Sequence, residues 1–313
     1  MRKLLVVWGL ILIVVLSGCR KEDAFVVGEN DIIINTGTEW ELPGILTLPE
    51  GKGPFPVAIF VQASVPEDRY LGESLIECLV KQGIAGILYE QRIFTYPQIT
   101  QDVNYTLKEG SVDDMLSAAA LAKTIKRINP DMIFVIGYSQ NGFLIPKIYE
   151  EDTESTIAGF ISMAGPAQPM MHENKERIEK LLSNTEISEG EINMYKTILG
   201  LFDEIENLTE ADLGKDQMLF GHYPSHWLYL ADYDPAESAK SMDKPVLFLH
   251  GSSDRDVSPD DLDIWKVATQ KNPKAAYKLY PGLNHDFGFY YTYAEVDEEV
   301  IIDIANFIKN RYK

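Results

Sequence analysis

The chain has 313 residues, of which 45% are hydrophobic, and its formal net charge is −20 at pH 7. So large an acidic excess argues against nucleic acid and anionic lipid surfaces as partners. The chain has only two cysteines, Cys19 and Cys78. If Cys19 is modified, no internal disulfide can form, and a buried core must supply the stability.

Residues 1–19 have the pattern of an export signal. They read MRKLLVVWGLILIVVLSGC, with Arg2 and Lys3 placed before an apolar run that extends from Leu4 to Leu16. This run is too short for a membrane-spanning helix, so the pattern predicts a signal peptide. An uncleaved N-terminal anchor is the alternative. In either case we expect the folded part outside the cytoplasmic membrane and tethered to it.

The end of this stretch, LSGC at residues 16–19, looks like a bacterial lipoprotein box. The resemblance implies that Cys19 is lipidated and becomes the first residue of the mature chain, after removal of a signal peptide over residues 1–18. A polar tether over residues 19–30 and a folded domain over residues 31–313 would follow. We therefore expect an exported lipoprotein at the outer face of the cytoplasmic membrane, or in the periplasm or outer membrane of a cell that has one.

Short apolar segments alternate with helical patterns along the rest of the chain. The segments expected as strands are 32–34, 45–48, 56–61, 84–89, 132–136, 157–163, 246–250 and 276–280. The segments expected as helices are 72–82, 112–128 and 295–309. This alternation implies right-handed crossovers and a mostly parallel sheet, whose active sites lie at the carboxyl ends of the strands. Cys78, within the first helical pattern, is expected to pack in the core.

A long polar stretch over about residues 167–240 interrupts the alternation, with helical patterns over 173–182 and 189–207. An insertion at this edge of the sheet would form a cap over the site. Its last third is rich in aromatic residues and histidine. These residues either pack a small cap core, which we favour, or line a substrate pocket.

The segment DMIFVIGYSQNGFLIP, residues 131–146, has the pattern of a nucleophile elbow: a buried strand, a sharp turn, a serine and a helix. Ser139 would stand above the sheet edge, where the first N–H groups of the helix can hold an oxyanion. A serine before a helix is also a common helix cap, so this segment alone leaves that alternative open. The segment departs from G-x-S-x-G because Asn141 replaces the last glycine and Gly142 follows it.

A serine nucleophile needs a base and a carboxylate that orients the base, in the chain order serine, acid, histidine. Among the five histidines, His285 is the best candidate base, because it lies on a loop between the last strand and the final helix. Asp254 and Asp256 both follow the preceding strand, and residue type does not choose between them. The carboxylate would hold the imidazole tautomer and stabilise the imidazolium.

Residues 40–309 resemble the α/β-hydrolase superfamily, and are most similar to bacterial esterases and acyl-transfer hydrolases related to dienelactone hydrolases and acyl-CoA thioesterases. The resemblance is carried by LTLP at 46–49, GPFPV at 53–57, PEDR at 66–69, AGF at 158–160 and AGP at 164–166. Gly251, Asp254 and Val257 match the family's G-x-x-D-x-x-V motif, and His285 matches its C-terminal G-x-x-H. The resemblance therefore selects Asp254 as the acid.

This resemblance implies an α/β-hydrolase fold, with a mostly parallel sheet flanked by helices and a helical cap. It also implies a serine hydrolase that cleaves a small carboxylic ester or thioester through a Ser139–His285–Asp254 triad and an acyl-enzyme. The backbone N–H groups of Gln140 and Ser64 would form the oxyanion hole. No metal or other cofactor is expected, because no histidine-rich or paired-carboxylate cluster suggests one.

Two departures from the family leave a second function open. Gln62 and Ala63 stand where the family has His-Gly before the oxyanion loop, and Asn141 stands in the elbow. Lost glycine freedom at the loop would misplace an oxyanion donor. The alternative is an inactive lipoprotein of the same fold that binds a small hydrophobic ligand. No pattern in the sequence indicates an oligomeric state.

Overall fold

An eight-stranded sheet forms the centre of the computed structural model, which describes residues 25–61, 68–183, 187–289 and 295–310. The strand order is β1-β2-β4-β3-β5-β6-β7-β8. The strands are β1 Gly28–Asn35, β2 Glu41–Leu48, β3 Phe55–Val61, β4 Ala85–Tyr89, β5 Ile128–Tyr138, β6 Gly159–Met163, β7 Val246–Gly251 and β8 Ala275–Tyr280. Strand β2 pairs antiparallel with β1 and β4, and all other neighbours are parallel. The expected mostly parallel sheet is confirmed.

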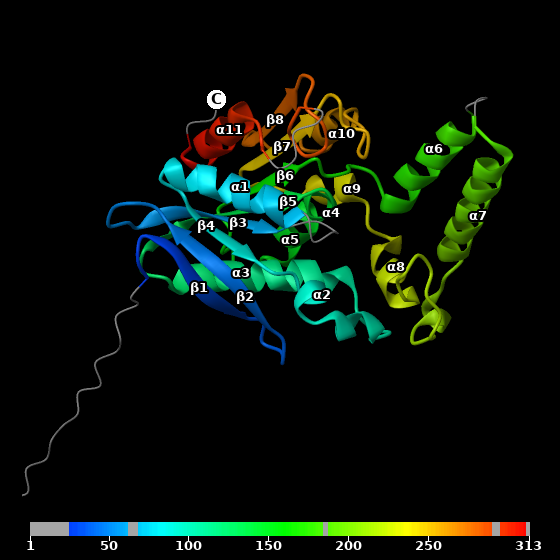
Figure 1. Ribbon diagram of the computed structural model, residues 1–313, viewed down its shortest axis with the longest axis horizontal. Coiled ribbons are helices and arrows are strands. Elements are labelled where there is room, and N and C mark those ends of the chain that lie inside the picture. The colour runs from blue at the N-terminus through cyan, green and yellow to red at the C-terminus, as the bar shows by residue number, and fades with distance from the viewer. Residues whose placement is uncertain (1–24, 62–67, 184–186, 290–294, 311–313) are drawn as a thin grey trace, which may run out of the picture.

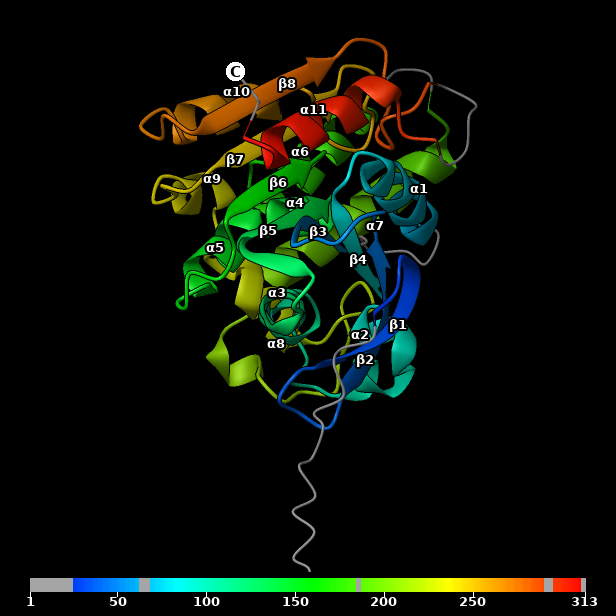
Figure 2. The same ribbon diagram turned by 90° about the vertical axis from the view of Figure 1, so that its left-hand side faces the viewer.

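Helices cover both faces of this sheet (Figure 2). The helices of one face are α1 Asp68–Lys81 and α11 Glu298–Ile308, and those of the other are α3 Asp114–Thr124, α5 Ile145–Glu151 and α10 Asp261–Ala268. In β5, Val135 belongs to the core on one face, and Phe134 and Ile136 to the core on the other. Burial on both faces explains the unbroken apolar runs of the parallel strands. Cys78 packs, partly buried, against the core beneath α1 and α11.

The helix expected over residues 112–128 is shorter at its C-terminal end. A π-helical turn, η2 Lys108–Asp113, precedes α3, which ends at Thr124. The backbone is already extended at Ile125, with φ −83° and ψ 115°, and β5 begins at Ile128, which pairs with Phe55.

Several strand boundaries also differ from expectation. β2 begins at Glu41 and not at residue 45, and β5 extends from Ile128 to Tyr138 and not over residues 132–136. β1 begins at Gly28, so residues 28–30 belong to the sheet and not to a tether, because they pair with Leu46–Leu48 of β2. β6 begins at Gly159 and not at residue 157, whose N–H donates to the Asp152 carboxylate. Residues 1–18 and Cys19 lie outside the described residues. In the part of the chain that the structure describes, no helix is long and apolar enough to cross a membrane.

The insertion lies between β6 and β7. Its elements are α6 Met170–Leu182, α7 Glu189–Glu206, η3 Glu210–Asp212, α8 Pro224–Ala231 and α9 Pro235–Ala239. Helices α6 and α7 form a hairpin that projects from the body of the molecule (Figure 1). Trp227 belongs to a small core of this cap, with Ile178, Phe202 and Ile205. Trp227 therefore packs the cap, as favoured from the sequence, whereas Tyr229 and Tyr233 pack against the core of the main domain.

Candidate active site

Ser139 lies in the sharp turn between β5 and α4 Gln140–Phe143, with φ 51° and ψ −115°. Positive φ is strained for a residue with a Cβ, and such strain is common at functional sites. The Ser139 N–H donates to the Met163 carbonyl at 2.8 Å, which holds the turn against β6. Its side chain forms no capping hydrogen bond with α4, so the simple helix-cap interpretation is wrong.

Strand β5 and helix α4 approach each other closely where Gly137 meets the backbone of Asn141. The elbow therefore accommodates an asparagine side chain at position 141. A Cβ at Gly137 would lie 2.3 Å from the Asn141 carbonyl oxygen, so only glycine fits there. Asn141 itself is fully buried. The departure from G-x-S-x-G therefore leaves the turn intact.

Asp254 follows β7, and its side chain is fully buried. Its Oδ1 accepts the N–H groups of Asp256 and Val257 at 2.8 and 3.0 Å, which leaves Oδ2 for another donor. The loop packs directly on the one that carries His285, since a Cβ at Gly251 would lie 2.3 Å from the Leu283 carbonyl oxygen. This close approach is the physical reason for a glycine at that place.

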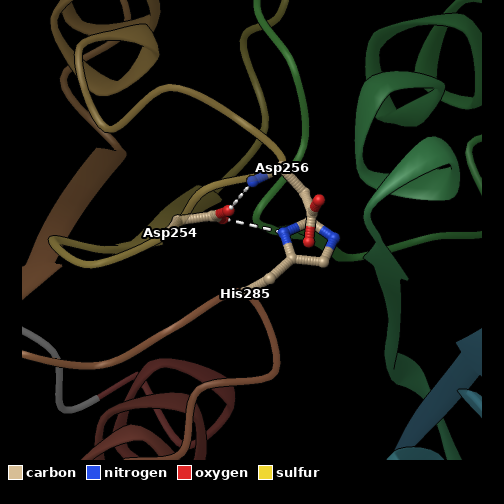
Figure 3. A group of neighbouring side chains, drawn as sticks. All are labelled: Asp254, Asp256 and His285. Atoms are coloured by element: carbon tan, nitrogen blue, oxygen red, sulfur yellow. Dashed lines mark hydrogen bonds and ion pairs between the residues drawn. The ribbon is translucent and has the colours of Figure 1, made fainter. Parts of the chain in front are cut away.

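The imidazole of His285 joins the acid and the serine. Its Nδ1 lies 2.8 Å from Asp254 Oδ2 (Figure 3), and its Nε2 lies 3.0 Å from Ser139 Oγ. With Nδ1–H donating to the carboxylate, Nε2 is left to accept the serine hydroxyl hydrogen. The three side chains follow β5, β7 and β8, whose carboxyl ends meet at one edge of the sheet. The structure thus brings together the three residues that the sequence predicted.

The surroundings of His285 change its basicity. Burial lowers the pKa of His285, but the hydrogen bond and the charge of Asp254 more than offset it, and Asp256 and Asp286 add in the same direction. The net result is a pKa above the ordinary value of 6.5. A base with a raised pKa takes up the hydroxyl proton more readily.

Sequence reasoning missed Tyr138, the residue before the serine. Its hydroxyl donates to Asp286 Oδ1 at 2.7 Å, and its ring centroid lies 5.1 Å from that of His285. This contact ties the histidine loop to the elbow strand. A tyrosine at the end of a strand and an aspartate in a loop carry no local pattern that would have indicated the pairing.

Asp254, Asp256 and His285 also form a set of possible metal ligands, whose ligand atoms lie within 4.8 Å of one another (Figure 3). Both oxygens of Asp254 already accept hydrogen bonds, one from backbone N–H groups and one from the imidazole. These bonds favour the pairing of acid and base over a cation between them.

Of the two predicted oxyanion donors, one lies among the described residues and the other does not. Gln140 is the first residue of α4, so its N–H lies in the turn beside Ser139. Ser64, like Gln62 and Ala63, lies outside the described residues. The structure therefore places one of the two.

An apolar cavity of about 280 Å³ lies at the base of the cap. It is lined mainly by Met170, Met171, Ile205, Leu208, Trp227 and Leu230. Pro169, six residues after the end of β6, also lines the cavity, together with the charged side chains of Lys175 and Glu206. An apolar group could bind there.

Comparisons with known proteins agree with this fold. No family model matches the chain. The chain is 25% identical over 264 residues to the esterase EstD of Thermotoga maritima, covering 82% of this chain and 59% of that relative. Est1E from Butyrivibrio proteoclasticus superposes with a TM-score of 0.57 at 18% identity, over 90% of this chain and 98% of its own. The Pyrococcus furiosus esterase Pf2001 superposes with a TM-score of 0.59 at 15% identity, over 92% of each chain.

The sheet topology, the elbow and these similarities show that the chain has the α/β-hydrolase fold. The chain is similar to esterases of Thermotoga maritima, Butyrivibrio proteoclasticus and Pyrococcus furiosus, and it spans 59% of the length of EstD.

Proposed function

We propose that the protein is a serine hydrolase of carboxylic esters or thioesters. The observation that carries the proposal is the continuous relay of Asp254, His285 and Ser139, with contacts of 2.8 and 3.0 Å. A serine, a base and an orienting acid at hydrogen-bond distances are what nucleophilic acyl transfer requires. The similarity to EstD supports the ester as substrate.

In the proposed reaction, His285 Nε2 takes the proton of Ser139 as Oγ attacks the acyl carbon. The carbonyl electron pair moves onto oxygen, and the backbone N–H groups of Gln140 and Ser64 stabilise the oxyanion. The imidazolium, stabilised by Asp254, then protonates the departing alcohol or thiol, leaving an acyl-enzyme. Water, deprotonated by the same histidine, attacks the acyl-enzyme. The acyl–Oγ bond then breaks, His285 returns the proton to Ser139 Oγ, and the acid is released.

The cavity at the base of the cap is the proposed site for the apolar part of the substrate. One similar structure, Est1E, has been determined with ferulic acid, an aromatic carboxylic acid. We expect Met171→Trp to fill the cavity and to reduce kcat/KM for an octanoyl ester about tenfold more than for an acetyl ester. Met194→Trp is the matched control, because Met194 is half exposed on α7 and does not line the cavity. Equal behaviour of the two variants would exclude the cavity as the acyl site.

The proposed location is a membrane surface, through a lipid on Cys19. The lipobox resemblance over residues 16–19 supports it. A Cys19→Ala protein that still partitions into membranes would count against it.

The proposed activity is tested by release of p-nitrophenol from acetyl, butyryl and octanoyl esters, with the full-length chain in mild detergent. We expect Ser139→Ala and His285→Ala each to reduce kcat/KM by at least about 10³-fold, because the triad acts as a unit. If wild type is no faster than Ser139→Ala on every ester, the chain is instead a ligand-binding lipoprotein. The intact triad geometry favours the hydrolase.

A further inference from the structure

A second carboxylate lies beside the candidate base. Asp256 is two residues beyond Asp254, and carboxylate oxygens of both lie within 4.8 Å of a ring nitrogen of His285. Figure 3 shows the Asp256 side chain reaching from the acid loop to the imidazole, while the dashed line from the ring leads to Asp254. The two acids therefore act differently on one histidine.

Asp256 is also the more exposed of the two acids. Its side chain is 68% exposed, whereas that of Asp254 is fully buried. Its backbone N–H donates to Asp254 Oδ1 at 2.8 Å, and this hydrogen bond holds the backbone of Asp256 beside Asp254. Its effect on the imidazole is therefore that of a nearby charge.

A cation from the cap lies next to this second carboxylate. Arg177 Nη1, on helix α6, lies 4.0 Å from Asp256 Oδ1, and its side chain is half exposed. This contact joins the projecting cap hairpin to the loop of the triad acid. A positive charge here opposes the influence of Asp256 on His285.

We propose that Asp256 is a positioning residue that makes His285 a stronger base, and that Arg177 of the cap weakens this effect by pairing with Asp256. The proposal rests on the role of His285 in the proposed function.

The other charged or titratable groups near the ring are Asp254, Asp286, His250 and Tyr138. Burial lowers the pKa of His250 to about 4, so this neighbour is neutral in the range where His285 titrates. Asp254 and Asp286 are each engaged by a hydrogen bond to another side chain. Asp256 is thus the neighbouring carboxylate whose charge a cap residue can modulate.

The test is the pH dependence of kcat/KM for p-nitrophenyl acetate, measured with the full-length chain. Asp256→Asn removes the charge at constant shape, and we expect the acid limb to move down by about 0.3–0.6 pH unit, since solvent and salt screen a charge at this distance. Arg177→Gln should move the limb up by about 0.1–0.3 pH unit, and the double variant should match Asp256→Asn. Asp263→Asn is the matched control, because Asp263 is an exposed carboxylate on α10 that pairs with Lys266.

The pKa of His285 is measured separately by NMR titration of the imidazole signals, with His285→Gln to assign the resonance. This readout needs no turnover, so it tests the pair even if no ester is hydrolysed. A downward shift in Asp256→Asn but not in Asp263→Asn supports the proposal. An unchanged pKa in Asp256→Asn overturns it, and an unchanged or lowered pKa in Arg177→Gln overturns the part played by the cap.

Discussion

Gly142 of the elbow helix and Gly165, just beyond β6, lie against each other without room for a side chain. A Cβ at Gly165 would lie 2.4 Å from the Gly142 carbonyl carbon and 2.4 Å from Ser162 Oγ. The Ser162 hydroxyl also donates to the Gly142 carbonyl at 3.0 Å. The glycine that this chain has one position later than the usual motif therefore supports the turn that carries Ser139.

We expect Gly165→Ala to destabilise the protein by about 1–3 kcal/mol, because overpacking a close backbone contact forces the elbow to shift. The same shift should reduce the proposed esterase activity, since Gly142 lies three residues after Ser139 in the elbow. Gly200→Ala is the control, because a Cβ there meets nothing within 4 Å, and it should stabilise helix α7 by about 0.5–1 kcal/mol. Chemical denaturation measures both. Equal stabilities would contradict this explanation of the elbow.

Ser139→Gly and Ser139→Ala should both lose the nucleophile but differ in stability. Glycine relieves the strain of φ 51°, whereas alanine keeps it. We expect Ser139→Gly to be more stable than Ser139→Ala by about 1 kcal/mol, even though glycine has more freedom in the unfolded chain. Thermal and urea unfolding measure the stabilities of the two variants. An alanine variant as stable as the glycine variant, or more stable, would show that the turn is unstrained.

The raised pKa of His285 predicts opposite effects of pH on activity and stability. The folded state holds the proton more tightly than the unfolded chain, whose histidine has a pKa of about 6.5. The stability that the imidazolium gains from Asp254 is therefore complete below about pH 6.5 and is lost as pH rises through the folded pKa. Over the same interval kcat/KM should rise, as His285 becomes the neutral base.

Unfolding free energies of wild type and His285→Gln, measured at pH 5 and pH 9, test this linkage. We expect the advantage of wild type to be larger at pH 5. A difference independent of pH would mean that the Asp254 hydrogen bond does not favour the charged imidazole.

Arg92 and Asp114 form a buried ion pair whose loss should be costly. The Arg92 Nε donates to Asp114 Oδ2 at 3.2 Å, and a second bond joins Nη2 to Oδ1, with both side chains at most 3% exposed. Burial raises the pKa of Asp114 to about 6, against the opposing effect of Arg92. We expect Asp114→Ala to cost about 3–5 kcal/mol, because it leaves a guanidinium unpaired in the core.

The double variant Arg92→Met, Asp114→Leu should cost less than Asp114→Ala alone, since no charge is then left buried. Urea unfolding of wild type, Arg92→Met, Asp114→Leu and the double variant closes the cycle. Additive losses would show that the two groups do not interact.

Local patterns in the sequence were sufficient to predict that the strands, the elbow and the loop that carries His285 exist, but not where each strand begins. Strands buried on both faces have unbroken apolar runs, and parallel topology then brings their carboxyl ends to one edge. This logic placed Ser139 and His285 together before any contact was known. The choice of Asp254 over Asp256 needed the family motif, because both aspartates follow the same strand.

The tertiary structure alone decided the contacts between distant loops and helices. Gly251 fits beneath Leu283, Tyr138 reaches Asp286, and Arg177 approaches Asp256. Each of these contacts joins segments that lie far apart in the chain and depends on how a crossover returns to the sheet, whereas sequence periodicity reports only the local face of a helix or strand. The local sequence therefore determined which residues form the candidate site. Tertiary packing determined which charged groups lie around His285.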